Sequence, residues 1–188
     1  ALSSAASDVY KRQIYVESEQ EIGGLLESAG VDQVDYRTAI VNPLVRNEEI
    51  LYQLNGMSMY SSTNTEEMWN FVKNMGFENL ENRFQYAGST EVMDMLLGIR
   101  YLFCRNTRTL HTAYKKIAES QSFDLYENPR ALRSGYMVSD SVLDYAMEGT
   151  DPLEVQNRLL SGIVGKRLYK MQTVNSDTAL IGNTTFNI

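Results

Sequence analysis

The sequence predicts an α/β fold in which helices cover a central β-sheet, with a mixed α+β arrangement as the alternative. Segments with helical spacing alternate with short extended segments along most of the chain, an order typical of a sheet packed between helices. An apolar run at 101–104, between two arginines, has the character of a buried central strand. Several predicted helices also begin with capping residues.

The first half of the chain is predicted to contain three helices, at about 19–29, 47–54 and 63–75. A glycine follows the first helix, and the third begins with the spacing of a capping box and carries an apolar stripe. Extended segments at 37–41 and 57–62 separate these helices.

The second of these helices is predicted from local signals. Asn47 is expected to be its N-cap, and Ile50, Leu51 and Leu54 are expected to face inward. The pair Asn55-Gly56 is expected to end it.

The second half is predicted to open with a helix at about 90–97 and then the buried strand at 101–104. A helix at about 107–117 follows, and further strands are predicted at 123–126 and 136–138. The clearest helix start comes at 151–154, where an acidic cap, a proline and a returning glutamate coincide.

These elements suggest a division of the chain. We expect a polar lead-in or linker at 1–20, one mixed α/β domain at 21–170, and the strand-like start of a following segment at 171–188. No run approaches the ~20 apolar residues that span a bilayer. The chain begins without methionine and without the pattern of a signal peptide, so we interpret it as an excised or processed piece, with removal of the initiator methionine as the alternative.

The composition limits the function classes. The 188 residues are 43% hydrophobic and 22% charged, as in ordinary globular domains. A net charge of −7 disfavours nucleic acid, whose binding needs clustered lysines and arginines. One cysteine and one histidine exclude a zinc site built from these residue types. No phosphate-binding or dinucleotide fingerprint is present, and we expect no cofactor.

No catalytic constellation stands out. Cys104 and His111 are a candidate nucleophile and base, but Cys104 ends the predicted buried strand, which favours an inert core thiol. Pairs of glutamates occur at Glu48/Glu49, Glu66/Glu67 and Glu78/Glu81. A glycosidase needs two such carboxylates facing each other, but the first two pairs occupy predicted helix starts, where the helix dipole favours acids. A free-standing hydrolase is the third hypothesis, and a glycosidase and esterase screen tests it.

Twelve tyrosines are the one unusual count. Tyrosine presents an apolar face and a polar tip, which suits sugar and protein surfaces. Tyr60, Ser61 and Ser62 lie just before a predicted helix and offer hydroxyls and backbone N–H groups to a ligand. The same residues suit a strand end that uses hydroxyls for capping, and we favour that interpretation.

Four segments, in order, resemble the extracytoplasmic region of the bacterial YfhO family. They are Arg37 with Asn55–Ser62 (NGMSMYSS) and the following helix, Leu96–Leu102 (LLGIRYL), Tyr126–Leu132 (YENPRAL) and Asp151–Asn157 (DPLEVQN). Together they cover about 35–170. Arg133 stands where that family often has proline.

The resemblance implies the soluble outer part of a large polytopic membrane protein, similar to glycosyltransferases that use lipid-linked sugars. Such proteins are associated with glycosylating cell-envelope polymers such as lipoteichoic acid. Their catalytic acids are expected in the membrane part, so no catalytic residue is carried over to this chain. The candidate ligand-binding residues are Tyr60, Ser61, Ser62, Arg37 and Asn128.

The resemblance also implies a location and partners. We expect the extracytoplasmic face of the cell membrane, with the transmembrane part of the same protein as one partner. A cell-envelope glycopolymer or a lipid-linked sugar is the other expected partner. The alternative is a structural or protein-interaction module, whose motifs serve the fold alone.

Overall fold

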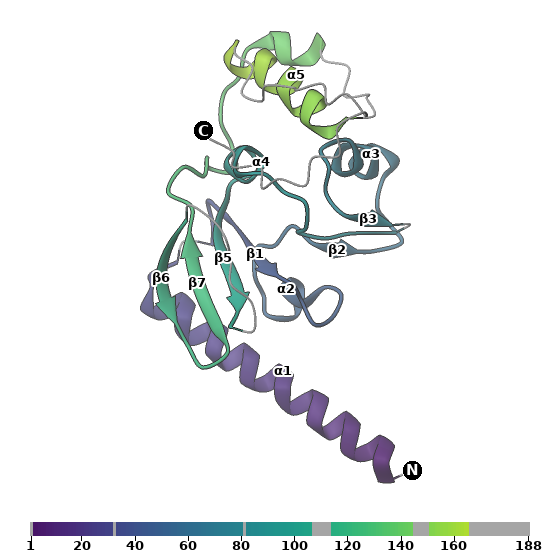
Figure 1. The fold of residues 1–188 in the computed structure, drawn as a ribbon, viewed down its shortest axis with the longest axis vertical. Coiled ribbons are helices and arrows are strands. Elements are labelled where there is room, and N and C mark those ends of the chain that lie inside the picture. Colours follow the sequence, from purple (N-terminus) through teal and green to yellow (C-terminus); the bar gives the residue numbers. More distant parts are fainter. Residues whose placement is uncertain (1, 32, 81, 107–113, 145–150, 166–188) are drawn as a thin grey trace, which may run out of the picture.

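A computed structural model describes residues 2–31, 33–80, 82–106, 114–144 and 151–165. It has the predicted α/β class, with a four-stranded sheet, a second sheet of three short strands, and helices around them (Figure 1). The helices are α1 (Leu2–Ser28), α2 (Glu48–Leu51), α3 (Glu66–Asn74), α4 (Glu91–Leu96), the 3-10 helix η1 (Asp140–Asp144) and α5 (Pro152–Val164). The strands are β1 (Arg37–Val41), β2 (Met59–Tyr60), β3 (Asn79–Leu80), β4 (Arg83–Phe84), β5 (Ile99–Arg105), β6 (Lys115–Glu119) and β7 (Phe123–Glu127).

The four-stranded sheet has the order β1-β5-β7-β6. β1 and β5 are parallel, and the other two pairs are antiparallel. The apolar run at 101–104 lies in the inner strand β5 and is buried throughout, as the sequence predicted. The crossover from β1 to β5 contains α2, the second sheet, α3 and α4, so these elements lie beside the parallel pair (Figure 1).

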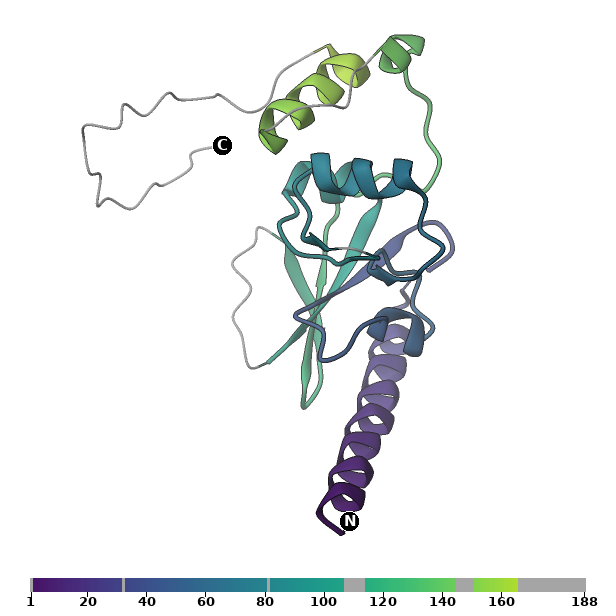
Figure 2. The same cartoon turned by 90° about the vertical axis from the view of Figure 1, so that its right-hand side faces the viewer.

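The second half of α1 packs against one face of this sheet (Figures 1 and 2). Ile22 and Leu25 join Phe103 and Leu125 in a buried apolar cluster. Glu21 fixes the helix to the β6–β7 turn, because its carboxylate accepts hydrogen bonds from two serines there. The helix extends well beyond the sheet toward its N-terminus (Figure 2).

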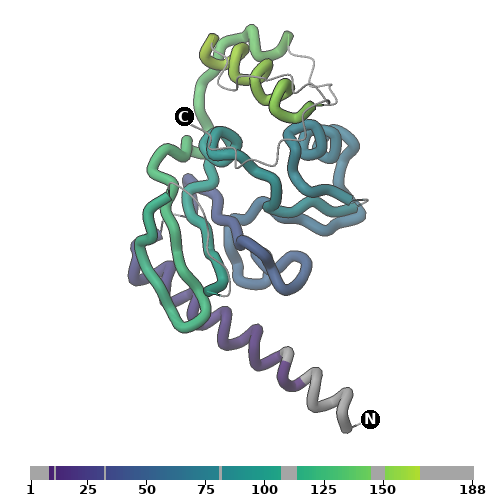
Figure 3. Tube along the Cα trace, viewed as in Figure 1, coloured from purple at the N-terminus to yellow at the C-terminus, as the bar shows by residue number. Residues whose placement is uncertain are grey.

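A second apolar cluster joins α3, α4 and α5 with strand β4 of the antiparallel sheet β2-β4-β3. Val72, Met93, Leu160 and Phe84 are among its buried members. The tube in Figure 3 follows the chain from α1 through the central sheet to this helical end of the molecule. Among the described residues, no helix is both long and apolar enough to cross a membrane.

Two cap predictions are confirmed. The Thr90 side chain accepts a hydrogen bond from the Met93 amide at α4, and the Asp151 side chain accepts from the Leu153 and Glu154 amides at α5. At α3 the predicted capping box, which runs from Thr63 to Glu66, was wrong by two residues: the N-cap is Thr65, which accepts from the Met68 amide.

Two helix predictions were wrong in extent. α1 begins at Leu2, so residues predicted as a polar lead-in are helical. Its apolar residues follow no single stripe, and Val9 and Tyr10 are exposed, which explains why helical spacing was visible only near Ile22. The helix predicted at about 107–117 was also wrong at its end, because Lys115–Glu119 forms the edge strand β6. Residues 107–113 lie outside the described part.

The predicted strand at 136–138 was wrong, since these residues form no strand and Met137 is almost fully exposed. The short helix α2 also differs from its prediction. Asn47 has φ 58° and gives no side-chain cap, and Ile50 and Leu51 are exposed whereas Leu54 is buried. The predicted segment at 171–188 lies outside the described residues.

Candidate functional site

Strand β2 and the turn after it present the three adjacent candidate residues. The Asn47 side chain donates to the Tyr60 carbonyl at 3.0 Å and accepts from the Tyr60 amide at 2.7 Å. This double contact fixes the backbone of Tyr60 to the loop before α2. The hydroxyls of Ser61 and Thr63 lie 2.7 Å apart, and Ser62 is exposed. Ser61 therefore stabilises the turn, and the Tyr60 side chain remains partly free.

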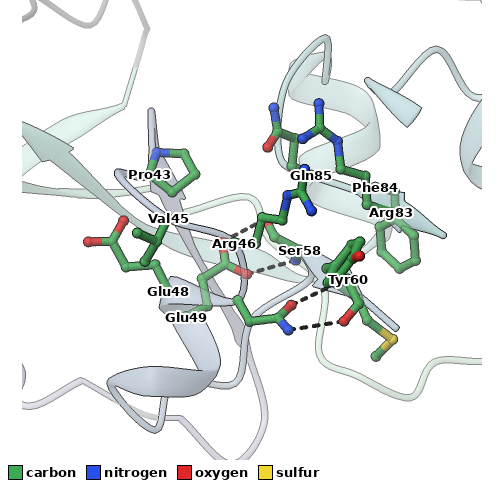
Figure 4. Close-up of a pocket in the computed structure, with 12 residues that line it drawn as sticks. Pro43, Val45, Arg46, Glu48, Glu49, Ser58, Tyr60, Arg83, Phe84 and Gln85 are labelled. Carbon is green, nitrogen blue, oxygen red and sulfur yellow. Dashed lines mark hydrogen bonds between the residues drawn. The ribbon is translucent and has the colours of Figure 1, made fainter. Parts of the chain in front are cut away.

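Tyr60 borders a small open cleft, here called the Tyr60 cleft (Figure 4). It is lined by residues 43, 45–49, 58–60 and 83–85. The Arg46 guanidinium lies 4.5 Å above the centre of the Tyr60 ring, a cation–π contact. The cavity volume is about 20 Å³, which is far below that of a preformed pocket for a drug-sized molecule. The cleft therefore suits one chemical group of a larger ligand.

Glu49 closes the floor of this cleft. Its carboxylate accepts hydrogen bonds from the Ile40 amide at 3.0 Å and from the Ser58 amide and hydroxyl at 2.7 and 3.0 Å. Burial raises the pKa of Glu49 above its ordinary value, against the opposing effect of these donors. A Cβ on Gly56 would lie 2.5 Å from the Cβ of Glu49, so only glycine permits this approach.

Glu48 is equally buried and forms a separate anchor. Its carboxylate pairs with Arg105 and accepts hydrogen bonds from the Tyr52 hydroxyl at 3.1 Å and the Leu44 amide at 2.6 Å. Glu48 and Glu49 occupy the first turn of α2, as predicted, but the sequence did not reveal that both are buried. Both are buried acceptors that hold the cleft's floor to the central sheet.

Arg37 and Asn128 lie away from the Tyr60 cleft, so the structure does not unite the five candidate residues. Arg37 begins β1, and its guanidinium donates to the Leu97 carbonyl. Asn128 is buried, donates to the Ile99 carbonyl at 3.2 Å and accepts from the Arg130 amide. The cleft lies past the opposite end of β1, because its first lining residue follows Val41 in the chain.

A second buried polar cluster was not found from the sequence. The Asp94 carboxylate accepts hydrogen bonds from the hydroxyls of Tyr86 at 2.8 Å, Tyr114 at 2.7 Å and Ser89 at 2.5 Å. Burial raises the pKa of Asp94 and of both tyrosines. The Tyr86 amide also donates to the Ser58 hydroxyl, so this cluster is joined to the floor of the cleft.

The proposed nucleophile pair gains no support from the described residues. Cys104 is buried in β5, and His111 lies outside the described residues. Within the described part, no group of three or more His, Cys, Asp or Glu residues is placed to hold a metal ion.

Of the other acidic pairs, Glu66/Glu67 lies within the described residues and does not form a facing dyad. Glu66 and Glu67 occupy the exposed first turn of α3, as predicted. The pKa of Glu67 is lowered by its hydrogen bonds to its own backbone amide and to Thr65. Glu78 forms an ion pair with Arg83 at 3.6 Å, and Glu81 lies outside the described residues.

Comparison with known proteins gives one match. Residues 3–186 match the protein family described as bacterial membrane protein YfhO. No curated protein matches the chain, and no solved structure matches it.

Proposed function

Because the chain belongs to the YfhO family of bacterial membrane proteins, we propose that it is an extracytoplasmic part of such a protein that supports glycosylation of a cell-envelope polymer. The polymer is of the lipoteichoic-acid type, and the chain contacts it or a lipid-linked sugar without catalysing transfer. Catalysis belongs to the transmembrane part of the same protein, which is the chain's main partner.

The observation that carries this proposal is the exposed Tyr60 ring at the rim of a cleft. Its backbone is fixed by Asn47, so little ordering of that backbone is needed when a ligand binds. A tyrosine ring packs against the apolar face of a sugar, and its hydroxyl remains available for hydrogen bonds. Ser62, exposed beside it, adds a further hydroxyl.

The acids of the cleft support a non-catalytic role. A glycosidase or transferase acid must face the reacting bond across open space. Both acids of the cleft instead face internal donors. The Glu48 carboxylate pairs with Arg105, and the Glu49 carboxylate accepts from Ile40 and Ser58. Moving either carboxylate toward a ligand would leave buried donors unpaired, which is costly.

The test is binding of teichoic-acid fragments and lipid-linked sugars, measured with the chain alone and with the membrane part restored. We expect Tyr60→Ala to weaken binding about tenfold, since loss of an aromatic contact of about 1.4 kcal/mol corresponds to that factor. Because Tyr60 is 44% exposed, its removal should change the free energy of unfolding little.

Tyr10→Ala is the matched control, because Tyr10 is also exposed but lies on the projecting end of α1. Its binding should equal that of the unchanged chain. If Tyr60→Ala binds as tightly as the unchanged chain, both alone and with the membrane part restored, a role for the cleft in sugar transfer is refuted.

The contacts of the shared motifs favour a second candidate, a purely structural or interaction module. Asn55 donates to the Tyr36 carbonyl at 3.0 Å, Gly56 packs on Glu49, and Asn128 holds a turn. These residues serve the fold. Alanine at Tyr60, Ser61 and Ser62 separates the two candidates: lost stability with unchanged binding favours the module, and the reverse favours sugar transfer.

A further inference from the structure

Two arginines line the Tyr60 cleft. Arg46 is exposed, and within the described residues its guanidinium has one recorded partner, the Tyr60 ring. Arg83 comes from strand β4, and its side chain is 24% exposed. Its ion pair with Glu78 is loose, at 3.6 Å, and its buried Nε has no hydrogen-bond partner. Both guanidinium groups therefore retain donors for a ligand.

Arg46, Arg83 and Gln85 all line the cleft, and their side chains are labelled there in Figure 4. Two positive charges that share one cleft repel each other, and a bound anion removes that cost. Gln85, which also lines the cleft, adds an amide donor.

The acids of the cleft do not cancel this positive charge at its mouth. Glu48 is fully buried and neutralised by Arg105. Glu49 is buried behind Ser58, with both oxygens occupied by internal donors. Arg83 is partly neutralised by Glu78, so the positive charge at the mouth is mainly that of Arg46, although the whole chain carries a net charge of −7.

We propose that the Tyr60 cleft binds a phosphate group between Arg46 and Arg83, with the Gln85 amide as a third donor. Guanidinium forks match the oxygens of a phosphate and bind them through charge-assisted hydrogen bonds. The enclosed volume is small, about 20 Å³, so the phosphate would lie at the mouth of the cleft and the rest of the ligand outside it. This inference does not require that the chain take part in sugar transfer.

The test titrates the 188-residue chain with inorganic phosphate, glycerol 3-phosphate and acetate at constant ionic strength. Binding is followed through the Nε–Hε NMR signals of the arginines. We expect both phosphates to shift the Arg46 and Arg83 signals saturably, and acetate to bind at least about tenfold more weakly because it offers fewer oxygens to two forks. Added salt should weaken binding, since Arg46 is exposed.

Arg46→Gln should lower phosphate affinity about tenfold or more, as expected for loss of one charge-assisted contact. It should leave folding intact because the side chain is exposed. Arg130→Gln is the charge-matched control, since Arg130 is 69% exposed and its nearest acid, Glu91, is 3.9 Å away. Its affinity should be unchanged.

Four results would overturn the proposal: no saturable shift with phosphate, equal binding of acetate, full affinity in Arg46→Gln, or equal weakening in the control variant. Vesicles that contain phosphatidylglycerol distinguish binding of a soluble phosphate from binding of a lipid surface. Binding to vesicles without binding to glycerol 3-phosphate would also overturn it. If Tyr60→Ala leaves polymer binding unchanged while the chain still binds phosphate, the proposed function is refuted and the phosphate site is not.

Discussion

Replacing Gly56 with alanine tests how the chain holds the buried Glu49 carboxylate. The new Cβ would lie 2.5 Å from the Cβ and 2.8 Å from the Cδ of Glu49, far inside van der Waals contact. The Glu49 side chain must move, and it then loses hydrogen bonds from Ile40 and Ser58.

The magnitude follows from two contributions. Overpacking a filled site costs about 1–3 kcal/mol, and each hydrogen bond lost by a buried charged group costs roughly 1.5–3 kcal/mol. Loss of one such bond together with the steric cost gives about 2.5–6 kcal/mol in the free energy of unfolding. This is a large share of the roughly 5–15 kcal/mol that stabilises an ordinary domain.

Urea unfolding followed by the fluorescence of Trp69, the single tryptophan, measures this change. Gly24→Ala is the control, because a Cβ on Gly24 meets nothing within 4 Å and the residue lies inside α1. It should stabilise the chain by about 0.5–1 kcal/mol through helix propensity. A Gly56→Ala chain within about 0.5 kcal/mol of the parent, the range of neutral surface changes, would refute the packing argument.

Two further changes test other parts of the structure. Burial raises the pKa of Asp94 in the folded state. The unchanged chain therefore loses stability as the pH rises through that folded-state pKa, whereas an asparagine at this position does not titrate. Asp94→Asn should consequently destabilise the chain less at pH 8 than near pH 4. A cost that is constant or grows with pH, measured by urea unfolding at both values, contradicts this. Asp151→Ala should cost about 1 kcal/mol because the cap of α5 accepts from two amides, whereas Asp151→Asn should stay within about 0.3 kcal/mol; equal costs for the two variants would show that the cap does not stabilise the helix.

The caps of α4 and α5 were predicted, and that of α3 was missed by two residues, because the interactions that define caps are local. Thr65, Thr90 and Asp151 accept hydrogen bonds from amides two or three residues later. Gly76 and Gly98 have positive φ, at 87° and 69°, as helix-ending glycines do. Such signals depend on neighbours in the sequence, so the sequence alone reveals them.

The errors arose where distant contacts decide the outcome. Lys115–Glu119 has no strand alternation of its own and becomes a strand by pairing with β7. Glu48 and Glu49 are helix-start acids, as predicted, but their burial was missed because it depends on donors from the central sheet, Arg105 and Ile40. The Asp94 cluster gathers hydroxyls from two segments, the loop that holds Tyr86 and Ser89 and the distant Tyr114, and no local pattern signals such convergence.

The candidate site divides in the same way. Tyr60 could be selected from the sequence because of its residue type and its position just before a predicted helix. The structure places it at the rim of a cleft. Arg46 and Arg83 were missed, because one belongs to a loop and the other to a two-residue strand. Arg37 and Asn128 were selected with Tyr60 because they share its motifs, yet they lie elsewhere in the fold.

The sequence by itself determined the α/β class, the buried strand β5, the position of α3 and the starts of α4 and α5, since each follows from periodicity and capping over a few residues. Only the tertiary structure decided that Glu48 and Glu49 are buried and that Arg46 and Arg83 share one cleft. The physical reason is that burial and charge pairing depend on distances in space, which are set when β1 pairs with β5 and the crossover between them folds against the sheet.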